Sequence, residues 1–308
     1  MTEEGFLSFV KTFLYEKEGE VWARDEDCAV VEEADFFRLY TADALVEGVH
    51  FHRGYFSPYA LGFKLAAVNL SDIAAMGGTP EWALLILGFS SPPEEDFVRE
   101  FYRGLNEALE TFGARLVGGD TVRSRELWAG LFLVGRAERP ILRRGARPGD
   151  LIYVSRPLGA AAAALRYFRE GRDPPKDLKK AHLFPEPEVE LGRTLAGEGL
   201  PTAMMDLSDG LLLDLSRLCR INGVGARLRD IPVADGATLE EALSGGEDYA
   251  LLFTVPPEKE SRLRDLAPRV LPLGEISPEP GIFLGDRLLS PTGFDHFASP
   301  GPDGPEQL

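Results

Sequence analysis

Six aspartates set in apolar or glycine-rich segments constrain the fold of this chain more than any other feature. Most of its 50 acidic residues can be solvated, but these six stand where a strand or helix would bury them. They are Asp27, Asp43, Asp72, Asp120, Asp206 and Asp209. A lone buried carboxylate is costly and tends to take up a proton unless a cation compensates it. A fold that buries several carboxylates must therefore bring them together around positive charge.

Each of these aspartates, taken alone, has an ordinary explanation as a helix N-cap, a turn residue or a salt-bridge partner. Together they favour a metal site, because the lysines and arginines are too dispersed along the chain to neutralise all six. We expect Asp43, Asp120 and Asp206 at the carboxyl ends of strands and Asp209 at the start of a helix. An all-oxygen ligand set without a His or Cys cluster favours Mg²⁺ over zinc, and Mg²⁺ commonly shares its shell with substrate phosphates.

The charge balance restricts the partners. Lys plus Arg is 33 against 50 Asp plus Glu, a net charge of −17, which argues against binding to duplex nucleic acid or to an anionic membrane. No segment approaches the roughly 20 apolar residues of a membrane span, and the first residues lack the basic start and apolar core of a signal peptide. We therefore expect a cytoplasmic enzyme whose polyanionic ligand arrives with cations.

Helical and strand patterns alternate along the 308 residues, which predicts an α/β or α+β fold in two similar halves. The polar, glycine-bearing segment 143–150 is typical of a linker, and we expect domains of residues 1–138 and 139–308. In the first domain we expect a hairpin over 28–42, helices over 57–76 and 92–112, and strands over 82–88, 115–118 and 127–136. In the second we expect strands over 151–154, 202–206, 225–229, 249–255 and 270–276, helices from 158 and over 188–197, 210–220 and 257–267, a surface loop over 170–180 and a disordered tail over 299–308.

Two glycine pairs precede acidic residues, one at Gly118-Gly119-Asp120 and one at Gly245-Gly246-Glu247. Glycine there lets backbone N–H groups approach a phosphate, although a tight turn explains the same residues. The chain has no GxxxxGK[ST], no HRD with DFG and no GxGxxG after a strand, so an ATP site would belong to none of those families. The similarity of residues 69–72 to residues 206–209 indicates either an internal duplication or a chance match.

Seven segments, taken in order, resemble the thiamine-monophosphate kinase family within the aminoimidazole-ribonucleotide synthetase-like superfamily. They are TADALVEGVHF (41–51), FKLAAVNLSDIAAMGGTP (63–80), LVGGDTVRS (116–124), RRGARPGDLIYVS (143–155), DLSDGLLLDL (206–215), LSGGEDYALLFTVP (243–256) and GFDHF (293–297). The chain departs from the family at Ala42, where Thr or Ser is common. It departs again at Arg144, which leaves open whether Arg143 or Arg144 meets ATP.

The resemblance implies direct in-line transfer of the γ-phosphoryl group of ATP to thiamine monophosphate, assisted by several Mg²⁺ ions. It also implies a homodimer whose N-terminal sheets pair into a barrel, with the nucleotide between the two halves of each chain. The implied Mg²⁺ ligands are Asp27, Thr41, Asp43, Asp72, Asp120, Asp206 and Asp209, of which Asp43, Asp120 and Asp209 are expected to act in catalysis. The implied ATP contacts are Tyr102, Gly119, Asp120, Arg143 and Ser208, and the implied thiamine phosphate contacts are His50, Glu247 and Phe294.

Several alternatives remain beside this interpretation. A hydrogenase-maturation relative needs a C-terminal cysteine, and a selenophosphate-synthesising relative needs an N-terminal one, for which Cys28 beside Asp27 is poorly placed. A purine-pathway synthetase of the same superfamily is a further alternative, although the GVHF and GGEDY stretches favour the thiamine enzyme. A non-enzymatic Ca²⁺-binding protein is a further alternative, but the sequence contains no EF-hand loop. A metal-dependent phosphatase is another, and it would differ by releasing inorganic phosphate without an acceptor.

Overall fold

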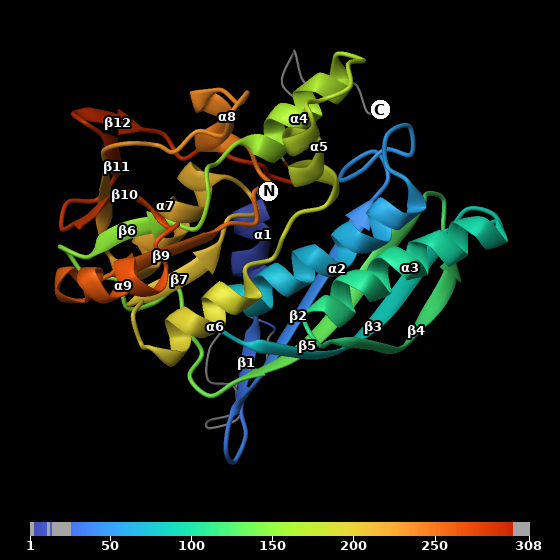
Figure 1. Ribbon diagram of the computed structural model, residues 1–308, viewed down its shortest axis with the longest axis horizontal. Coiled ribbons are helices and arrows are strands. Elements are labelled where there is room, and N and C mark those ends of the chain that lie inside the picture. Colours follow the sequence, from blue (N-terminus) through green and yellow to red (C-terminus); the bar gives the residue numbers. More distant parts are fainter. Residues whose placement is uncertain (1–2, 11–12, 14–25, 298–308) are drawn as a thin grey trace.

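Two β-sheets with helices packed on them make up the protein in a computed structural model that describes residues 3–10, 13 and 26–297 (Figure 1). The first half contains α1 (Glu3–Val10), β1 (Ala29–Glu32), β2 (Phe37–Val46), α2 (Pro58–Ala75), β3 (Thr79–Phe89), α3 (Glu95–Thr111), β4 (Arg115–Arg123) and β5 (Trp128–Ala137). The second contains β6 (Leu151–Val154), α4 (Ala160–Arg169), α5 (Lys176–Leu183), α6 (Val189–Gly197), β7 (Ala203–Asp206), α7 (Leu211–Asn222), β8 (Gly225–Leu228), α8 (Leu239–Ser244), β9 (Leu251–Val255), α9 (Glu260–Leu266), β10 (Leu271–Ser277), β11 (Ile282–Leu284) and β12 (Arg287–Leu289).

The first sheet has the strand order β1-β2-β5-β3-β4, and only its β3–β4 pair is parallel. Side chains alternate between its two faces, as the pleat requires. One face packs on α2 and α3 (Figure 1). The other face leaves Leu84, Ile86 and Val122 exposed among the residues that the structure describes.

Helix α2 lies between the two halves and is buried on almost every side. It begins where Ser57 accepts a hydrogen bond from the Ala60 N–H, with Pro58 in the first turn, an arrangement typical of a helix N-terminus. It packs on α3, α6, β2, β5 and β7. A Cβ added to Gly104 of α3 would lie 2.0 Å from the Tyr59 carbonyl oxygen, so these two helices approach at a distance that only glycine allows.

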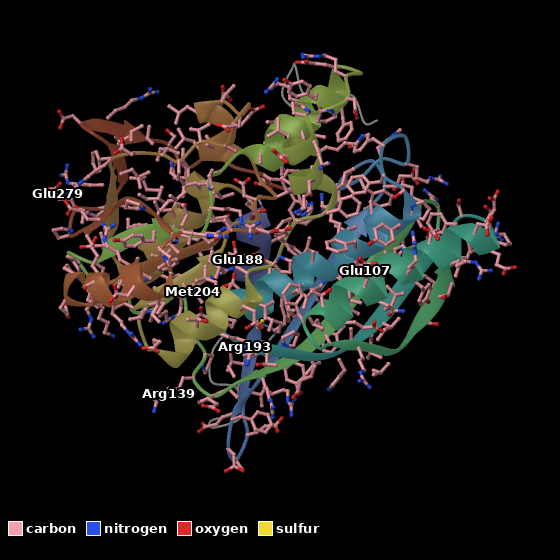
Figure 2. All side chains as sticks on the ribbon, in the orientation of Figure 1. Glu107, Arg139, Glu188, Arg193, Met204 and Glu279 are labelled. Atoms are coloured by element: carbon pink, nitrogen blue, oxygen red, sulfur yellow. The ribbon has the colours of Figure 1, made fainter. Side chains whose placement is uncertain are left out.

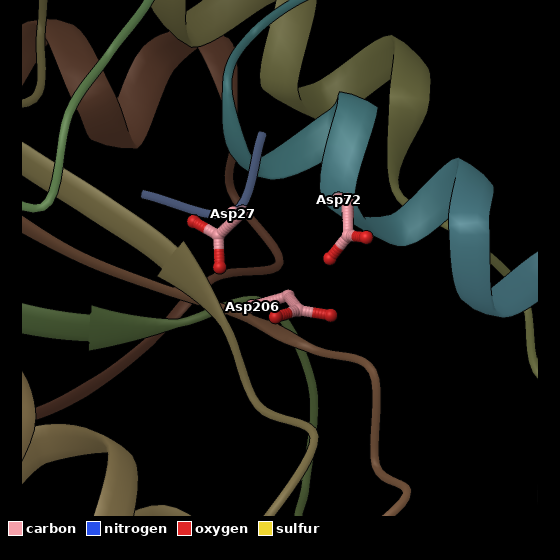
Figure 3. Close-up of side chains that lie close together, drawn as sticks. All are labelled: Asp27, Asp72 and Asp206. Atoms are coloured by element: carbon pink, nitrogen blue, oxygen red, sulfur yellow. The ribbon is translucent and has the colours of Figure 1, made fainter. Parts of the chain in front are cut away.

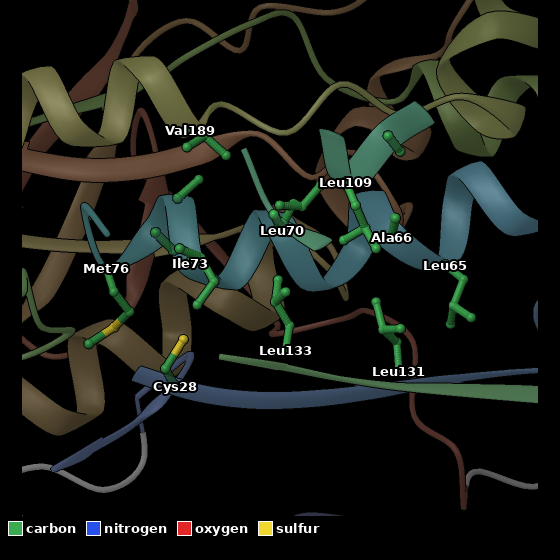
Figure 4. Close-up of a cluster of buried hydrophobic side chains, with 14 of the residues drawn as sticks. Cys28, Leu65, Ala66, Leu70, Ile73, Met76, Leu109, Leu131, Leu133 and Val189 are labelled. Carbon is green, nitrogen blue, oxygen red and sulfur yellow. The ribbon is translucent and has the colours of Figure 1, made fainter. Parts of the chain in front are cut away.

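The second sheet has the order β12-β11-β8-β10-β6-β9-β7. Its core is continuous with that of the first half, since Leu251 and Phe253 of β9 belong to the same buried cluster as α2. Figure 4 shows this cluster around α2, with Leu131 and Leu133 of the first sheet on one side and Val189 of α6 on the other. In Figure 2, Met204 of β7 and Glu188, which precedes α6, lie where the two halves meet. We propose that the halves correspond to domains 1–138 and 139–308.

The structure confirms the hairpin, the helix over 57–76 and the strands of the second sheet up to β10, but it differs from the sequence prediction in three places. The expected loop over 170–180 contains the start of α5, because Pro175 directly precedes that helix instead of ending one. Strands β2 and β4 continue to Val46 and Arg123, past Asp43 and Asp120. Helix α8 and strands β11 and β12 were not predicted, and the tail over 299–308 lies outside the described residues.

Among the helices that the structure describes, none combines the length and the apolar character needed to cross a bilayer.

Candidate active site

Three aspartates from distant parts of the sequence meet where the two halves join. Asp27 precedes β1, Asp72 lies near the C-terminal end of α2 and Asp206 is the last residue of β7. Each offers a carboxylate oxygen, and these oxygens lie within 4.8 Å of one another. Figure 3 shows the three side chains pointing toward a common centre. The fold therefore brings together three of the six aspartates, although they lie far apart in the sequence.

The last turns of α2 organise the surroundings of this cluster. Thr41 of β2 donates a hydrogen bond to Asp72, and Ser71 donates one of 2.7 Å to Asp206. The Asp43 N–H donates to the side-chain oxygen of Asn69 at 3.1 Å. The two similar tetrapeptides at 69–72 and 206–209 thus face each other. One of them is helical and the other leaves a strand, so the two tetrapeptides do not share a local structure.

The electrostatics of this cluster suit a bound cation. Burial, followed by repulsion from the neighbouring carboxylates, raises the pKa values of Asp72 and Asp206 well above their ordinary range. The pKa of Asp43 is also raised by burial, with the charges of Asp209 and Asp27 adding to it. One buried oxygen of Asp27 has no hydrogen-bond partner within the described part of the chain. Crowded, buried carboxylate oxygens fit a hard divalent cation such as Mg²⁺, which would restore their ionised state.

Two arginines neutralise part of this acidic region, and the expectation that the basic residues are too dispersed is wrong to that extent. Arg143 forms an ion pair with the fully buried Asp27. Arg217 of α7 forms ion pairs with Asp209 and Asp214. Arg144 is exposed. Arg143 is thus paired with the aspartate cluster, while the side chain of Arg144 faces solvent.

Sequence reasoning missed two acidic residues of this region. The buried Asp214 accepts hydrogen bonds from the N–H groups of Asp209, at 3.0 Å, and Gly210, at 3.2 Å, which fixes the loop before α7. Glu26 accepts a hydrogen bond from the Arg143 N–H, and burial raises its pKa to about 7. Asp214 sits in as apolar a segment as Asp209, so the same criterion could have selected it.

Asp120 and Gly119 lie on β4, away from the three aspartates. Strands β5 and β3 separate β4 from the strand that carries Asp43, a distance of about 14 Å at roughly 4.8 Å per strand. The carboxylate of Asp120 is exposed and accepts a hydrogen bond from the N–H of the next residue. A Cβ on Gly119 would meet the Leu85 carbonyl oxygen at 1.9 Å, so strand packing alone requires this glycine. Tyr102 lies on α3, whose strand neighbour is β4, and is likewise not brought to the cluster.

The residues expected to contact thiamine phosphate form a second group beside the first. The rings of His50 and Phe294 lie 6.4 Å apart, and the Phe294 N–H donates to the Asp209 carbonyl at 3.0 Å. The Val46 N–H donates to Nδ1 of His50 at 3.1 Å, and burial lowers the pKa of His50 to about 4, so this ring is neutral. The Glu247 N–H donates to the Ser208 carbonyl at 2.8 Å. Both groups therefore share the loop that follows β7.

Comparison with known proteins agrees with this architecture. Residues 25–137 match the AIR synthase related protein, N-terminal domain, and residues 147–286 match the AIR synthase related protein, C-terminal domain. The chain is 33% identical to a thiamine-monophosphate kinase from Aquifex aeolicus over 96% of this chain and 98% of the relative. It is 36% identical to the Haemophilus influenzae protein of that name, over 88% of this chain and 90% of the relative.

Solved structures give the same result. A structure of AaThiL complexed with AMPPCP and TMP superposes with a TM-score of 0.87 at 33% identity, covering 96% of this chain and 97% of the other. The structure of tt0281 from Thermus thermophilus gives 0.85 at 29% identity, covering 94% and 98%. The hydrogenase maturation protein HypE shares only the fold, at 15–17% identity. By its family-model matches and its relatives, the chain belongs to the thiamine-monophosphate kinase family of AIR synthase related proteins.

Proposed function

We propose that the chain uses ATP to phosphorylate thiamine monophosphate to thiamine diphosphate, with Mg²⁺ assistance and by direct in-line transfer. The observation that carries the proposal is the cluster of Asp27, Asp72 and Asp206 at the junction of the halves. Support comes from relatives named for this reaction and from a similar structure complexed with an ATP analogue and TMP. We further propose that the protein acts in the cytoplasm.

The proposal gives separate roles to the metal ligands and to the residues that contact the acceptor. The Mg²⁺ ligands are proposed to be Asp27, Thr41, Asp43, Asp72, Asp206 and Asp209, with Asp120 added as described below. Bound Mg²⁺ supplies the positive charge that brings two anionic phosphates together. The acceptor is a phosphate oxygen that is already ionised, so the chain needs no strong general base. We propose that His50, which is neutral, and Phe294 contact the ring portion of thiamine monophosphate.

The two neighbouring arginines take different parts in this proposal. Arg143 neutralises Asp27 and thereby limits the charge of the cluster. Arg144, which is exposed next to it, is free to reach a nucleotide phosphate. We keep Arg143 as the proposed ATP contact, with Arg144 as the alternative, together with Gly119, Asp120, Tyr102 and Ser208.

The free edges of the first sheet support a homodimer. In the described part of the chain, β4 is an edge strand, and residues 41–46 of β2 pair only with β5. Joining β4 of one subunit to β2 of its partner, twice, would close a barrel and cover the exposed Leu84 and Ile86. The same joining would carry Asp120 from one subunit to the neighbourhood of Asp43 in the other. We propose that Asp120 acts across this interface.

The experiment mixes the purified protein with ATP, thiamine monophosphate and Mg²⁺ and measures ADP and thiamine diphosphate. We expect equal amounts of both products, none of either without the acceptor, and none after chelation. Phosphate release without acceptor would show a phosphatase instead and overturn the proposal. Recovery of a phosphorylated side chain after rapid quenching would contradict direct transfer.

A further inference from the structure

The buried ammonium group of Lys64 lies behind the carboxylate of Glu247, the residue proposed to contact thiamine monophosphate. The proposed reaction does not use this ammonium group. Lys64 of α2 is fully buried, and its Nζ lies 2.7 Å from Oε1 of Glu247. His182 of α5 is 2% exposed, and its Nδ1 lies 3.1 Å from Oε2 of the same carboxylate. Glu247 itself keeps 23% of its side chain exposed. Each carboxylate oxygen thus has its own nitrogen partner from the interior, and the remaining surface of the group faces outward.

Glu247 is the only compensation that this buried charge receives among the described residues. Neither Lys64 Nζ nor either ring nitrogen of His182 has a hydrogen-bond partner there, so their contacts with Glu247 are ion-pair contacts. The ammonium otherwise faces the Phe56 ring, 5.2 Å from its centroid. An ammonium removed from water without a counter-ion is strongly unfavourable, so the pair holds Glu247 as an anion. Burial alone would raise the pKa of Glu247, but the charge of Lys64, together with His182, lowers this pKa below its usual range.

The backbone at this point is also held in an unusual conformation. Glu247 and Tyr249 have φ values of 68° and 46°, and they are the two non-glycine residues with positive φ in the described chain. Such conformations persist where the surroundings impose them, and they concentrate at functional sites. Here the surroundings are the hydrogen bonds from the N–H groups of Glu247 and Tyr249 to the carbonyls of Ser208 and Leu207, both 2.8 Å long.

Helix α2 connects this ion pair to the metal cluster. Lys64 and Asp72 are eight residues apart on one helix, which corresponds to about 12 Å along its axis. A single rigid element thus sets the separation between the phosphate end and the ring end of a bound acceptor. Because Lys64 cancels its charge, Glu247 can accept hydrogen bonds from the ring end without adding net negative charge beside two phosphorylated substrates.

We propose that Lys64, completed by His182, is a positioning residue that holds Glu247 for recognition of the ring portion of the acceptor. This assignment rests on the proposed function, because it takes Glu247 as a contact of thiamine monophosphate. Lys64 touches neither substrate in this proposal and acts through Glu247 alone.

The test is a double-mutant cycle on the full-length protein with Lys64→Met, Glu247→Gln and the double variant. Lys64→Met should raise the KM for thiamine monophosphate about tenfold or more, the loss expected when a hydrogen bond to a charged group is misplaced. The kcat and the KM for ATP should change by less than about threefold, and Lys64→Arg should restore the KM. In the Glu247→Gln background, Lys64→Met should add less than about threefold, since its route of action is already removed. His182→Gln should give a smaller increase in KM than Lys64→Met.

The matched control is Lys179→Met on α5, which removes an exposed ion pair with Asp173 and should leave both KM values unchanged. If Lys64→Met lowers the Tm so far that it fails to fold, a cycle of His182→Gln with Glu247→Gln takes its place: His182→Gln should raise the KM for thiamine monophosphate in the wild-type background and leave it unchanged in the Glu247→Gln background. Equal KM increases in the wild-type and Glu247→Gln backgrounds, or a loss confined to kcat, overturn the assignment. A wild-type protein inactive toward thiamine monophosphate overturns the proposed function, and the assignment falls with it.

Discussion

The buried carboxylates Asp27, Asp72 and Asp206 carry a conflict between stability and activity. Their mutual repulsion in a buried setting opposes folding unless protons or cations are bound. Sequence reasoning could find these residues because an aspartate among apolar neighbours is conspicuous. It could not find Lys64, because a lysine in an apolar helix is equally consistent with a side chain whose end reaches solvent.

Replacement of Asp72 by Asn is expected to raise the Tm of the metal-free protein by a few degrees while removing at least about 99% of turnover. The reason is that the substitution removes the cost of burying or protonating one crowded carboxylate and, with it, one proposed metal ligand. Thermal denaturation in a chelator and a steady-state assay measure the two effects. The exposed Asp230→Asn is the control and should change neither. A variant that keeps wild-type turnover at limiting Mg²⁺ would remove Asp72 from the ligand set.

The pH dependence of stability follows from the same groups. Burial raises the pKa of Glu26 from 4.5 to about 7 and that of Asp214 from 3.8 to about 7. A group with a raised folded-state pKa stabilises the fold below its ordinary pKa, and this contribution is lost as pH rises through the folded value. The Tm in a chelator should therefore fall as the pH rises from 4.5 through about 7, because the acids with a raised pKa, which include Asp43, Asp72 and Asp206, outnumber His50 and His182, whose lowered pKa values act in the opposite direction.

Added Mg²⁺ should counter this loss, because metal ligands must be deprotonated to bind. The increase in Tm on adding Mg²⁺ should therefore grow over the same pH range. Thermal-shift measurements with Mg²⁺ and with chelator across the range test both statements. A Tm in chelator that rises with pH would contradict the raised pKa values.

At the scale of elements, helix α2 shows what a sequence can and cannot predict. Its start at Ser57-Pro58 and its end before Gly77 follow from local chemistry and are confirmed. Its position between the two halves could not be predicted, because that position depends on close approaches to α3 and α6 that no local pattern encodes. The start of α5 was missed for a related reason, since Pro175 suits both a loop and the residue before a helix.

The approach of α2 to α3 predicts a large effect for a small substitution. Gly104→Ala places a methyl group 2.0 Å from the Tyr59 carbonyl oxygen, so the helices must separate. We expect a loss of about 1–3 kcal/mol in the free energy of unfolding, the usual cost of overpacking. Chemical denaturation measures it. Gly197→Ala at the end of α6 is the matched control, because nothing lies within 4 Å of its added Cβ. A neutral Gly104→Ala would show that the helices have room to shift.

At the scale of the whole molecule, the proposed metal ligands of a single chain do not all lie at one site. Asp43 and Asp120 occupy strands separated by two others. The sequence selected both as aspartates that the fold would bury, which is wrong for the exposed Asp120, and it could not show that one chain keeps the two apart. Their separation depends on strand order, which is set by long-range pairing and not by local pattern.

Subunit complementation tests the proposed contribution across the interface. Asp120→Asn alone should remove most turnover, as Asp72→Asn does. Unfolding and refolding a mixture of the two inactive variants should recover about a quarter of wild-type activity, because half of the random dimers carry one intact site out of two.

The control for complementation mixes Asp72→Asn with Asp206→Asn, whose altered residues belong to the same site of one chain. That mixture should recover nothing. Failure of the first mixture to recover activity, with dimers verified by light scattering, would place Asp120 in its own subunit's site or in no site.

The burial of α2 between the two halves limits how substrates can enter and products can leave. Many enzymes that join two substrates swing one lobe about a hinge to shut out water. Here a swing of that kind would strip α2 from β7 and α6 on one side or from β2 and β5 on the other, exposing Leu70 and Ile73 to solvent. We therefore expect ATP and thiamine monophosphate to enter through movements of surface segments, while the two halves keep their relative positions.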